Sequence, residues 1–149
     1  MIQWIVENLL PITIVNPDEQ GIVIRRGRYI RTVDSGVYWS FPLVDEVQTI
    51  TVTPQVIDLP DQVIEIEGKP YVVSVSVEYS VEDAKKAMLE VQDYDAAVIN
   101  RTMELVLKHE GDCEAVEDEI STIAEGWGLI VSNVHLNQKS PCRVIRLVQ

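Results

Sequence analysis

The segment YVVSVSVEYSV, residues 71–81, is the clearest strand in the sequence, because large apolar side chains recur at every second position. Successive side chains of an extended chain point to opposite faces, so this period separates two faces of different character. The first face carries Val73, Val75, Val77 and Tyr79, and the second carries Val72, Ser74, Ser76 and Glu78. Such alternation predicts a strand in a half-buried sheet.

The chain before this segment also has the pattern of strands. Short β-branched runs are separated by turn signals, as in GIVIRRG, RYIRTV, VQTITVTPQVIDLP and QVIEIE. Gly27 marks a turn between the first two runs, and EGKP at 67–70 marks a hairpin turn. Pro54 and Pro60 indicate bends or edges, because proline cannot donate a hydrogen bond to a strand ladder.

The chain after residue 80 has mostly helical periodicity. Ser80 and Asp83, in SVED, resemble a capping box that begins a first helix. A second helix, YDAAVINRTMELVLKHEG, ends at Gly111, and a third begins near Asp112 and stops at the GWG of 126–128. LIVSNVHL follows as a closing strand, and CRVIRLV as a last strand or an extended arm. The prediction is an α+β chain whose antiparallel β-rich N-terminal half packs on a smaller half with about three helices and the closing strand.

Residue types that carry catalysis or bind metals are scarce in the sequence. There are two histidines, His109 and His135, and two cysteines, Cys113 and Cys142, without a CxxC spacing. The spacing of His109 and Cys113 fits a shared metal on one helix face, but Gly111 between them breaks that helix. Nucleophile-elbow, Walker and dinucleotide motifs are absent. We therefore expect no catalytic residue, metal, cofactor or small-molecule substrate, and an enzyme with an unmarked site is the open alternative.

The net charge of −12 disfavours nucleic-acid binding, because phosphates would be repelled. The charge is uneven, since IRRGRYIR concentrates arginines whereas residues 58–125 are rich in acids. A chain with separate positive and negative zones can pair head to tail with copies of itself. The side chains expected to pair in this way are Arg25, Arg26, Arg28, Arg31, Glu114, Glu117 and Asp118. A solvated surface with accidental clustering is the alternative.

The first residues, MIQWIVENLLPITIV, are apolar but lack the basic region and the cleavage site of a signal peptide. They are too short to cross a bilayer, because a spanning helix needs about 20 apolar residues. They fit a short amphipathic helix at a membrane interface, and packing on the domain itself or on a neighbouring subunit is the alternative. The side chains expected to contact lipid or a neighbour are Ile2, Trp4, Ile5, Leu9 and Leu10.

An aromatic run, VDSGVYWSFPLVDEV, occupies residues 33–47. Gly36 permits a tight backbone before it. Alternation then places Val37, Trp39 and Phe41 on one face, and Tyr38 and Ser40 on the other. Such a run fits a core, a partner-binding face or a membrane contact, and the pattern alone leaves all three open.

The segments, in their order along the chain, resemble those of the SPFH family, also called the band 7 or prohibitin-homology family. The matching residues between Ile22 and Pro60 are Arg25, Gly27, Arg28, Gly36, Tyr38, Phe41, Pro42, Asp45 and Val47. IEIEGKPYVVSVSVEYSVED is similar to the family's hairpin, although Glu67 stands where the turn usually has Asp. GWGLIVSNVHL is similar to the strand after the family's last domain helix. Ser35 departs from the family pattern, which usually has Pro before the Gly.

The resemblance implies an SPFH domain over residues 14–137. The implied division is an apolar segment 1–13, a β-rich part 14–80, a helical part 81–127, a strand 128–137 and a basic tail 138–149. The family carries its aromatic run on the side that faces the membrane. We therefore expect Tyr38 or Trp39 to contact lipid or a neighbouring subunit, with a pure core position as the alternative.

The resemblance also implies a function, a non-enzymatic scaffold that self-assembles into a ring-like homo-oligomer. It would associate with the cytoplasmic face of a membrane and organise lipids or membrane proteins, such as a membrane protease. Against the family pattern we expect a shortened N-terminal anchor, and KSPCRVIRLVQ in the place of the family's long C-terminal coiled coil. Two alternatives therefore stay open. One is a soluble ring or collar in a larger assembly such as a virion, and the other is a truncated adapter that joins a longer relative's ring.

Overall fold

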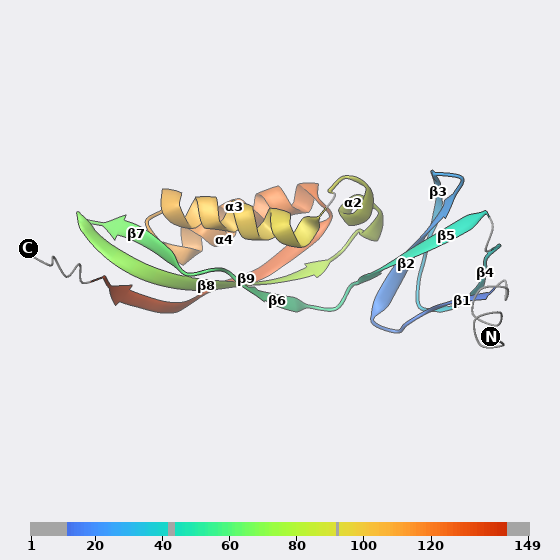
Figure 1. Ribbon diagram of the computed structural model, residues 1–149, viewed down its shortest axis with the longest axis horizontal. Helices are drawn as coiled ribbons and strands as arrows, with labels where there is room; N and C mark the ends of the chain where they lie inside the picture. The colour runs from blue at the N-terminus through green and yellow to red at the C-terminus, as the bar shows by residue number, and fades with distance from the viewer. Residues whose placement is uncertain (1–11, 42–43, 92, 143–149) are drawn as a thin grey trace, which may run out of the picture.

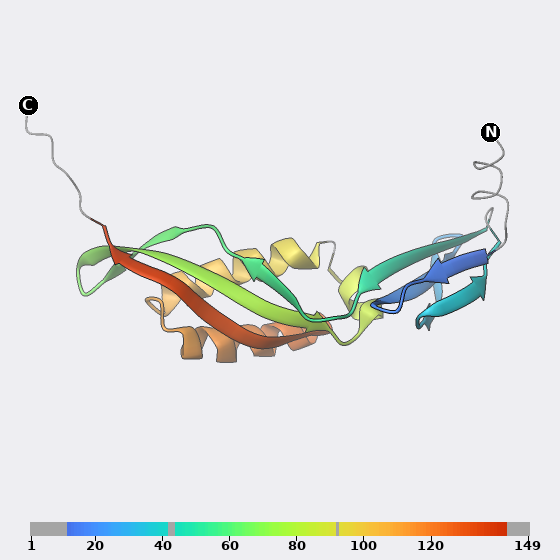
Figure 2. The same ribbon diagram turned by 90° about the horizontal axis from the view of Figure 1, so that it is seen from below.

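The computed structural model describes residues 12–41, 44–91 and 93–142. The molecule is elongated, with β1 to β5 at one end, α3 and α4 beside a long sheet at the other, and α2 between them (Figures 1 and 2). The strands are β1 (Ile12–Val15), β2 (Glu19–Arg25), β3 (Arg28–Val33), β4 (Gly36–Trp39), β5 (Asp45–Thr51), β6 (Gln55–Asp58), β7 (Gln62–Ile66), β8 (Lys69–Val81) and β9 (Leu129–Pro141). The helices are α2 (Ala84–Leu89), α3 (Tyr94–Lys108) and α4 (Cys113–Gly126). This arrangement confirms the predicted α+β class.

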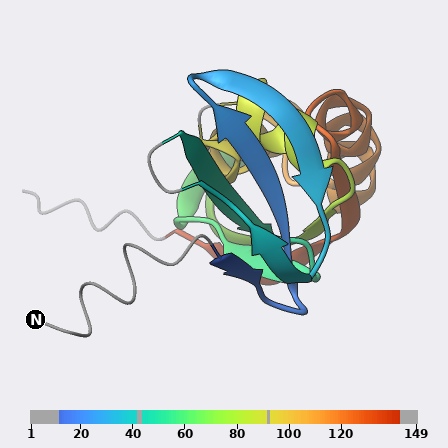
Figure 3. The same cartoon turned by 90° about the vertical axis from the view of Figure 1, so that its right-hand side faces the viewer.

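Two small sheets form the N-terminal end. β3, β2 and β5 make an antiparallel sheet in that order, and β1 and β4 pair separately into an antiparallel ribbon. The ribbon packs on one face of the three-stranded sheet (Figure 3). A small core lies between them, made of Val15, Val23 and Val33 with Tyr38 and Val47 packed against it.

The long strand β8 organises the other end. It is hydrogen-bonded to β6 and β7 along one edge and to β9 along the other. Val73, Val75, Val77 and Tyr79 are at most 3% exposed. Their face of the sheet is the one that α3 and α4 cover (Figure 1). The alternation predicted for residues 71–81 is therefore confirmed, and this face is the main hydrophobic core.

A polar contact fixes the first turn of α3 on this sheet. The Tyr79 hydroxyl donates a hydrogen bond to the Asp95 carboxylate, and the Tyr79 and Tyr94 rings meet edge to face at 6.4 Å. Burial raises the pKa of Tyr79, and its hydrogen bond to Asp95 adds to that effect. The buried hydroxyl thereby keeps a partner that replaces water.

The capping box predicted at Ser80 is wrong. β8 continues to Val81, and Ser80 pairs with Ile130 of β9. The N-cap of α2 is Asp83, whose side chain accepts a hydrogen bond from the Lys86 amide at 3.2 Å. Because Ser80 is paired with Ile130 of β9, its backbone is extended and cannot begin a helix. A long-range strand pairing thus overrides the local capping signal.

The ends of the next two helices follow the predicted signals closely. The C-cap of α3 is His109, and the Gly111 amide donates to the Val106 carbonyl at 2.9 Å. Gly111 has a φ of +79°, and this left-handed conformation closes the helix. Asp112 is the N-cap of α4, as expected. β9 runs to Pro141, so residues 138–141, expected in the tail, continue the closing strand.

Gly128 joins the end of α4 to the beginning of α2. Its carbonyl accepts hydrogen bonds from the Glu82 and Asp83 amides at 2.9 and 3.0 Å. Its φ is +76°, and a Cβ added there would lie 2.7 Å from the Asp83 carbonyl oxygen. A side chain at this position would therefore meet both backbone strain and a backbone atom that cannot move aside.

We predict that Gly128→Ala lowers the free energy of unfolding by about 2–4 kcal/mol, because it adds left-handed strain and a steric clash. Chemical denaturation measures the change. Gly126→Ala is the matched control, since Gly126 is helical and has no atom within 4 Å of an added Cβ. The control should gain about 0.5–1 kcal/mol. Equal unfolding free energies for Gly128→Ala and the natural chain would contradict this account of the joint.

Candidate functional site

One side of the β1–β4 ribbon is apolar and faces away from the protein. Ile12 pairs with Trp39, and Ile14 pairs with Val37, so these four side chains form a cross-strand block. Phe41 continues the same alternation beyond β4. The exposed fractions are 42% for Ile12, 68% for Ile14, 68% for Val37, 74% for Trp39 and 62% for Phe41. We call these five side chains the apolar ribbon face.

The opposite side of the ribbon faces the small core. Val15 is 2% exposed, and Tyr38 packs against the buried valines. The hydroxyls of Thr13 and Ser40 share a hydrogen bond of 2.6 Å. The ribbon therefore folds on its mixed side and leaves its apolar side in water.

This arrangement confirms the predicted alternation of the aromatic run. Val37, Trp39 and Phe41 share one face, and Tyr38 and Ser40 share the other. A core position for the first three is wrong, because all three are more than 60% exposed. Trp39 stands on the apolar ribbon face, whereas Tyr38 lies on the inner side. The expectation that either residue contacts lipid or a neighbour stays a prediction.

Sequence reasoning placed Val37 and Phe41 on the face of Trp39 but did not name them as contact residues, and it missed Ile12 and Ile14. The signal was present, because ITIV at residues 12–15 alternates as GVYW at 36–39 does. The two runs became one surface only through antiparallel pairing. The predicted contacts Ile2, Trp4, Ile5, Leu9 and Leu10 lie outside the described residues. In the part of the chain that the structure describes, no helix is long and apolar enough to span a bilayer.

An ion pair holds the loop that carries Phe41. Asp45 accepts hydrogen bonds from Arg25 Nε at 2.6 Å, from Arg25 Nη2 at 3.0 Å and from the Phe41 amide at 3.1 Å. The Asp45 side chain is 2% exposed. The hydrogen bond from Arg25, followed by that from Phe41, lowers the pKa of Asp45 to about 2. The carboxylate is therefore charged at neutral pH and fixes Phe41 relative to β2.

The four arginines predicted as a basic surface have different environments. Arg25 is bound to Asp45, and the Arg31 guanidinium lies 5.9 Å from the centroid of the Tyr38 ring. Arg26 and Arg28 are exposed in the β2–β3 turn, and neither makes an ion pair with another described residue. This turn therefore presents two free positive charges.

The acidic side chains predicted to pair with these arginines lie on the first turns of α4. Glu117 accepts a hydrogen bond from the Val134 amide of β9 at 3.1 Å, so it already has an internal role. Glu114 and Asp118 are exposed. Their helix, α4, lies beside the long sheet, away from the end of the molecule that carries β2 and β3 (Figure 1). Pairing between copies stays a prediction.

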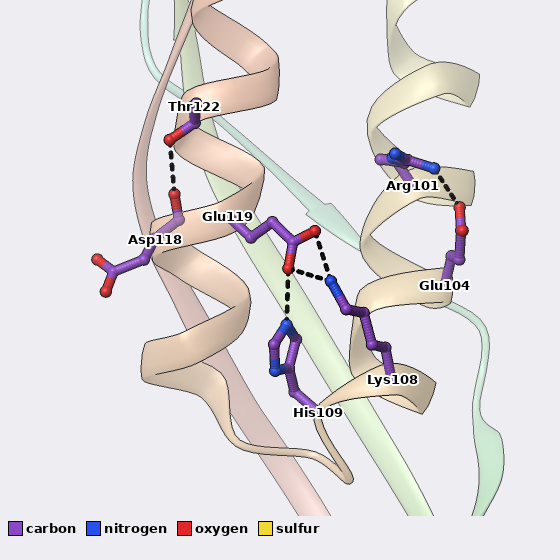
Figure 4. Close-up of polar contacts among 7 residues, drawn as sticks. All are labelled: Arg101, Glu104, Lys108, His109, Asp118, Glu119 and Thr122. Atoms are coloured by element: carbon purple, nitrogen blue, oxygen red, sulfur yellow. Dashed lines mark hydrogen bonds and ion pairs between the residues drawn. The ribbon is translucent and has the colours of Figure 1, made fainter.

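His109 takes part in a polar contact between α3 and α4. Its Nε2 lies 2.8 Å from Glu119, and Lys108 Nζ donates to both oxygens of the same carboxylate at 2.8 and 2.7 Å (Figure 4). The Lys108 contact, followed by that of His109, lowers the pKa of Glu119. His109 thus points to a carboxylate. Among the described residues, no three His, Cys, Asp or Glu side chains gather as a metal site.

Comparison with known proteins identifies the family of the chain. A model of the SPFH domain / Band 7 family matches residues 13–110. The chain is similar to an uncharacterized protein of Methanocaldococcus jannaschii, with 28% identity over 87% of this chain and 72% of the relative. It is also similar to an uncharacterized protein of Methanothermobacter thermautotrophicus, with 27% identity over 86% of this chain and 45% of that longer relative. Since the family match covers more than half of its residues, the chain belongs to the SPFH domain / Band 7 family.

Proposed function

We propose that the chain is a non-enzymatic SPFH scaffold. It self-assembles into a ring-like homo-oligomer and attaches to the cytoplasmic face of a membrane, where it organises lipids or membrane proteins. The apolar ribbon face carries this proposal, because four of its large apolar side chains are cross-strand neighbours and all five are between 42% and 74% exposed. The proposal also includes the contacts with lipid or a neighbour that the sequence predicts for Ile2, Trp4, Ile5, Leu9 and Leu10.

Exposing such a face to water is unfavourable, and this supports its interpretation as a contact surface. Contiguous exposed apolar patches on soluble proteins mark protein or membrane interaction sites, whereas single exposed residues are ordinary. Removing apolar surface from water contributes about 25 cal/mol per Å². Trp39 suits a membrane interface in particular, because tryptophan has an apolar ring with a polar N–H and concentrates at the headgroup level.

The rigidity of the ribbon also favours binding. Antiparallel pairing holds the block formed by Ile12, Ile14, Val37 and Trp39, and the Arg25–Asp45 ion pair holds Phe41. A face that is already ordered loses little conformational entropy when it binds. The same face would suit a second copy of the chain, and this is the soluble ring or collar alternative.

We predict that the double variant Trp39→Ser/Phe41→Ser binds phospholipid vesicles at least about tenfold more weakly, because two large apolar side chains no longer leave water. Vesicle flotation measures the bound fraction. The matched control is Val56→Ser/Val63→Ser, which removes two apolar side chains of 63% and 62% exposure from the long sheet. The control should bind as the natural chain does. Equal loss in both variants, or in neither, would count against the proposed membrane face.

We also predict that the purified chain forms a defined homo-oligomer in buffer without detergent or lipid. Light scattering gives its absolute mass. A strict monomer at micromolar concentration would overturn assembly by the domain alone. A closed oligomer that does not bind vesicles would favour the soluble ring or collar, because the apolar ribbon face would then be buried between copies.

A further inference from the structure

Hydrogen bonds connect the β2–β3 turn to the loop beside the apolar ribbon face. The Arg26 amide donates to the Val44 carbonyl at 3.3 Å, so the turn is bonded to the loop that follows Phe41. Beside this bond, Asp45 links Arg25 to the Phe41 amide. The β2–β3 turn, which carries the exposed Arg26 and Arg28, is therefore held against the loop that carries Phe41.

The turn does not need arginine for its own geometry. Arg26 and Gly27 have φ values of 50° and 76°, which are typical of a two-residue hairpin turn with two left-handed positions. The β7–β8 hairpin has the same conformation at Glu67 and Gly68, with φ of 50° and 76°. An acid thus occupies the equivalent position at the other end of the molecule. The backbone conformation of this type of hairpin turn therefore does not require the positive charge at Arg26.

The charge around the turn is positive although the chain is acidic. Asp45 is neutralised by Arg25, whereas the nearby Glu46 contributes one negative charge, because the hydrogen bond that it accepts at 2.7 Å comes from the neutral amide of Gln48. Two arginines against this one carboxylate leave the turn with a net positive charge. Arg26 and Arg28 remain unpaired among the described residues. The acidic start of α4 lies toward the opposite end of the molecule (Figure 1). Physiological salt screens exposed charges beyond about 8 Å, so those distant acids do not cancel the local charge.

We propose that Arg26 and Arg28 bind anionic lipid headgroups while the apolar ribbon face enters the interface, so that the protein selects membranes that contain anionic lipid. This inference rests on the proposed membrane attachment and adds its lipid preference. An apolar face beside basic side chains is the combination that interfacial segments use on anionic membranes. Each basic residue near such a surface strengthens binding by roughly fivefold.

The same arginines are the ones expected to pair with Glu114 and Asp118 of another copy. That use leaves the neighbouring apolar surface unexplained, because α4 contributes no side chain to the exposed large hydrophobic residues of the described chain. An anionic membrane accommodates the arginines and the apolar ribbon face together. The lipid surface is therefore the partner that the observations favour.

The test compares vesicles of phosphatidylcholine alone with vesicles that also contain phosphatidylglycerol. We expect the natural chain to bind the mixed vesicles roughly tenfold or more tightly, with an advantage that shrinks as salt is added. The variant Arg26→Gln/Arg28→Gln should lose this advantage and keep its binding to phosphatidylcholine. The control Lys69→Gln/Lys86→Gln removes the same charge from two exposed sites elsewhere that make no ion pair with a described residue, and it should keep the advantage.

The outcomes separate this inference from the proposed function. An equal preference for phosphatidylglycerol in both variants, or no preference in the natural chain, overturns the lipid selection and leaves membrane attachment standing. Failure of the natural chain to bind either vesicle overturns both. A smaller mass of Arg26→Gln/Arg28→Gln in light scattering, with unchanged lipid preference, assigns the turn to another copy. The salt dependence of the natural chain tests the inference without any variant.

Discussion

The structure depends on β8, a strand of 13 residues that is hydrogen-bonded along both edges and buried on one face. β6 and β7 hold one edge and β9 holds the other, so segments far apart in the chain meet on this strand. α3 and α4 cover its valine face and form the main core. Gly128 closes the arrangement by binding the corner where β8 leads into α2. The helices are thereby placed by the sheet more than by their own propensity.

The N-terminal end depends on a different constraint. Its core is small, with Val15, Val23 and Val33 buried. Polar contacts therefore carry much of its shape, above all the buried carboxylate of Asp45 with its partners on Arg25 and Phe41. A charge-assisted, bidentate contact of this kind fixes orientation more strictly than apolar packing does. The consequence is that one loop, one turn and one ribbon stay in fixed relation at the tip of the molecule.

Features with a local cause could be predicted from the sequence. The period of two in residues 71–81 gave the buried face of β8, and Asp112 and Gly111 marked the helix ends correctly. Features with a distant cause could not. Ser80 has a capping signal, but its backbone pairs with Ile130, and no local pattern shows that. The aromatic run revealed its two faces, but a period of two cannot tell which of them a ribbon turns toward the core. Likewise, Arg25 finds Asp45 only because β2 pairs with β5.

The apolar ribbon face contributes little to folding, and this makes it informative. The inner side of the ribbon already packs on the small core through Val15 and Tyr38, and Thr13 and Ser40 satisfy each other's hydroxyls. Polar side chains at Ile14 or Trp39 would leave these contacts intact and would suit water better. The fold therefore gives no reason for five large apolar residues on the outer side. We therefore attribute them to the proposed contact outside the described protein, and the exposed arginines at the adjoining turn favour an anionic surface for that contact.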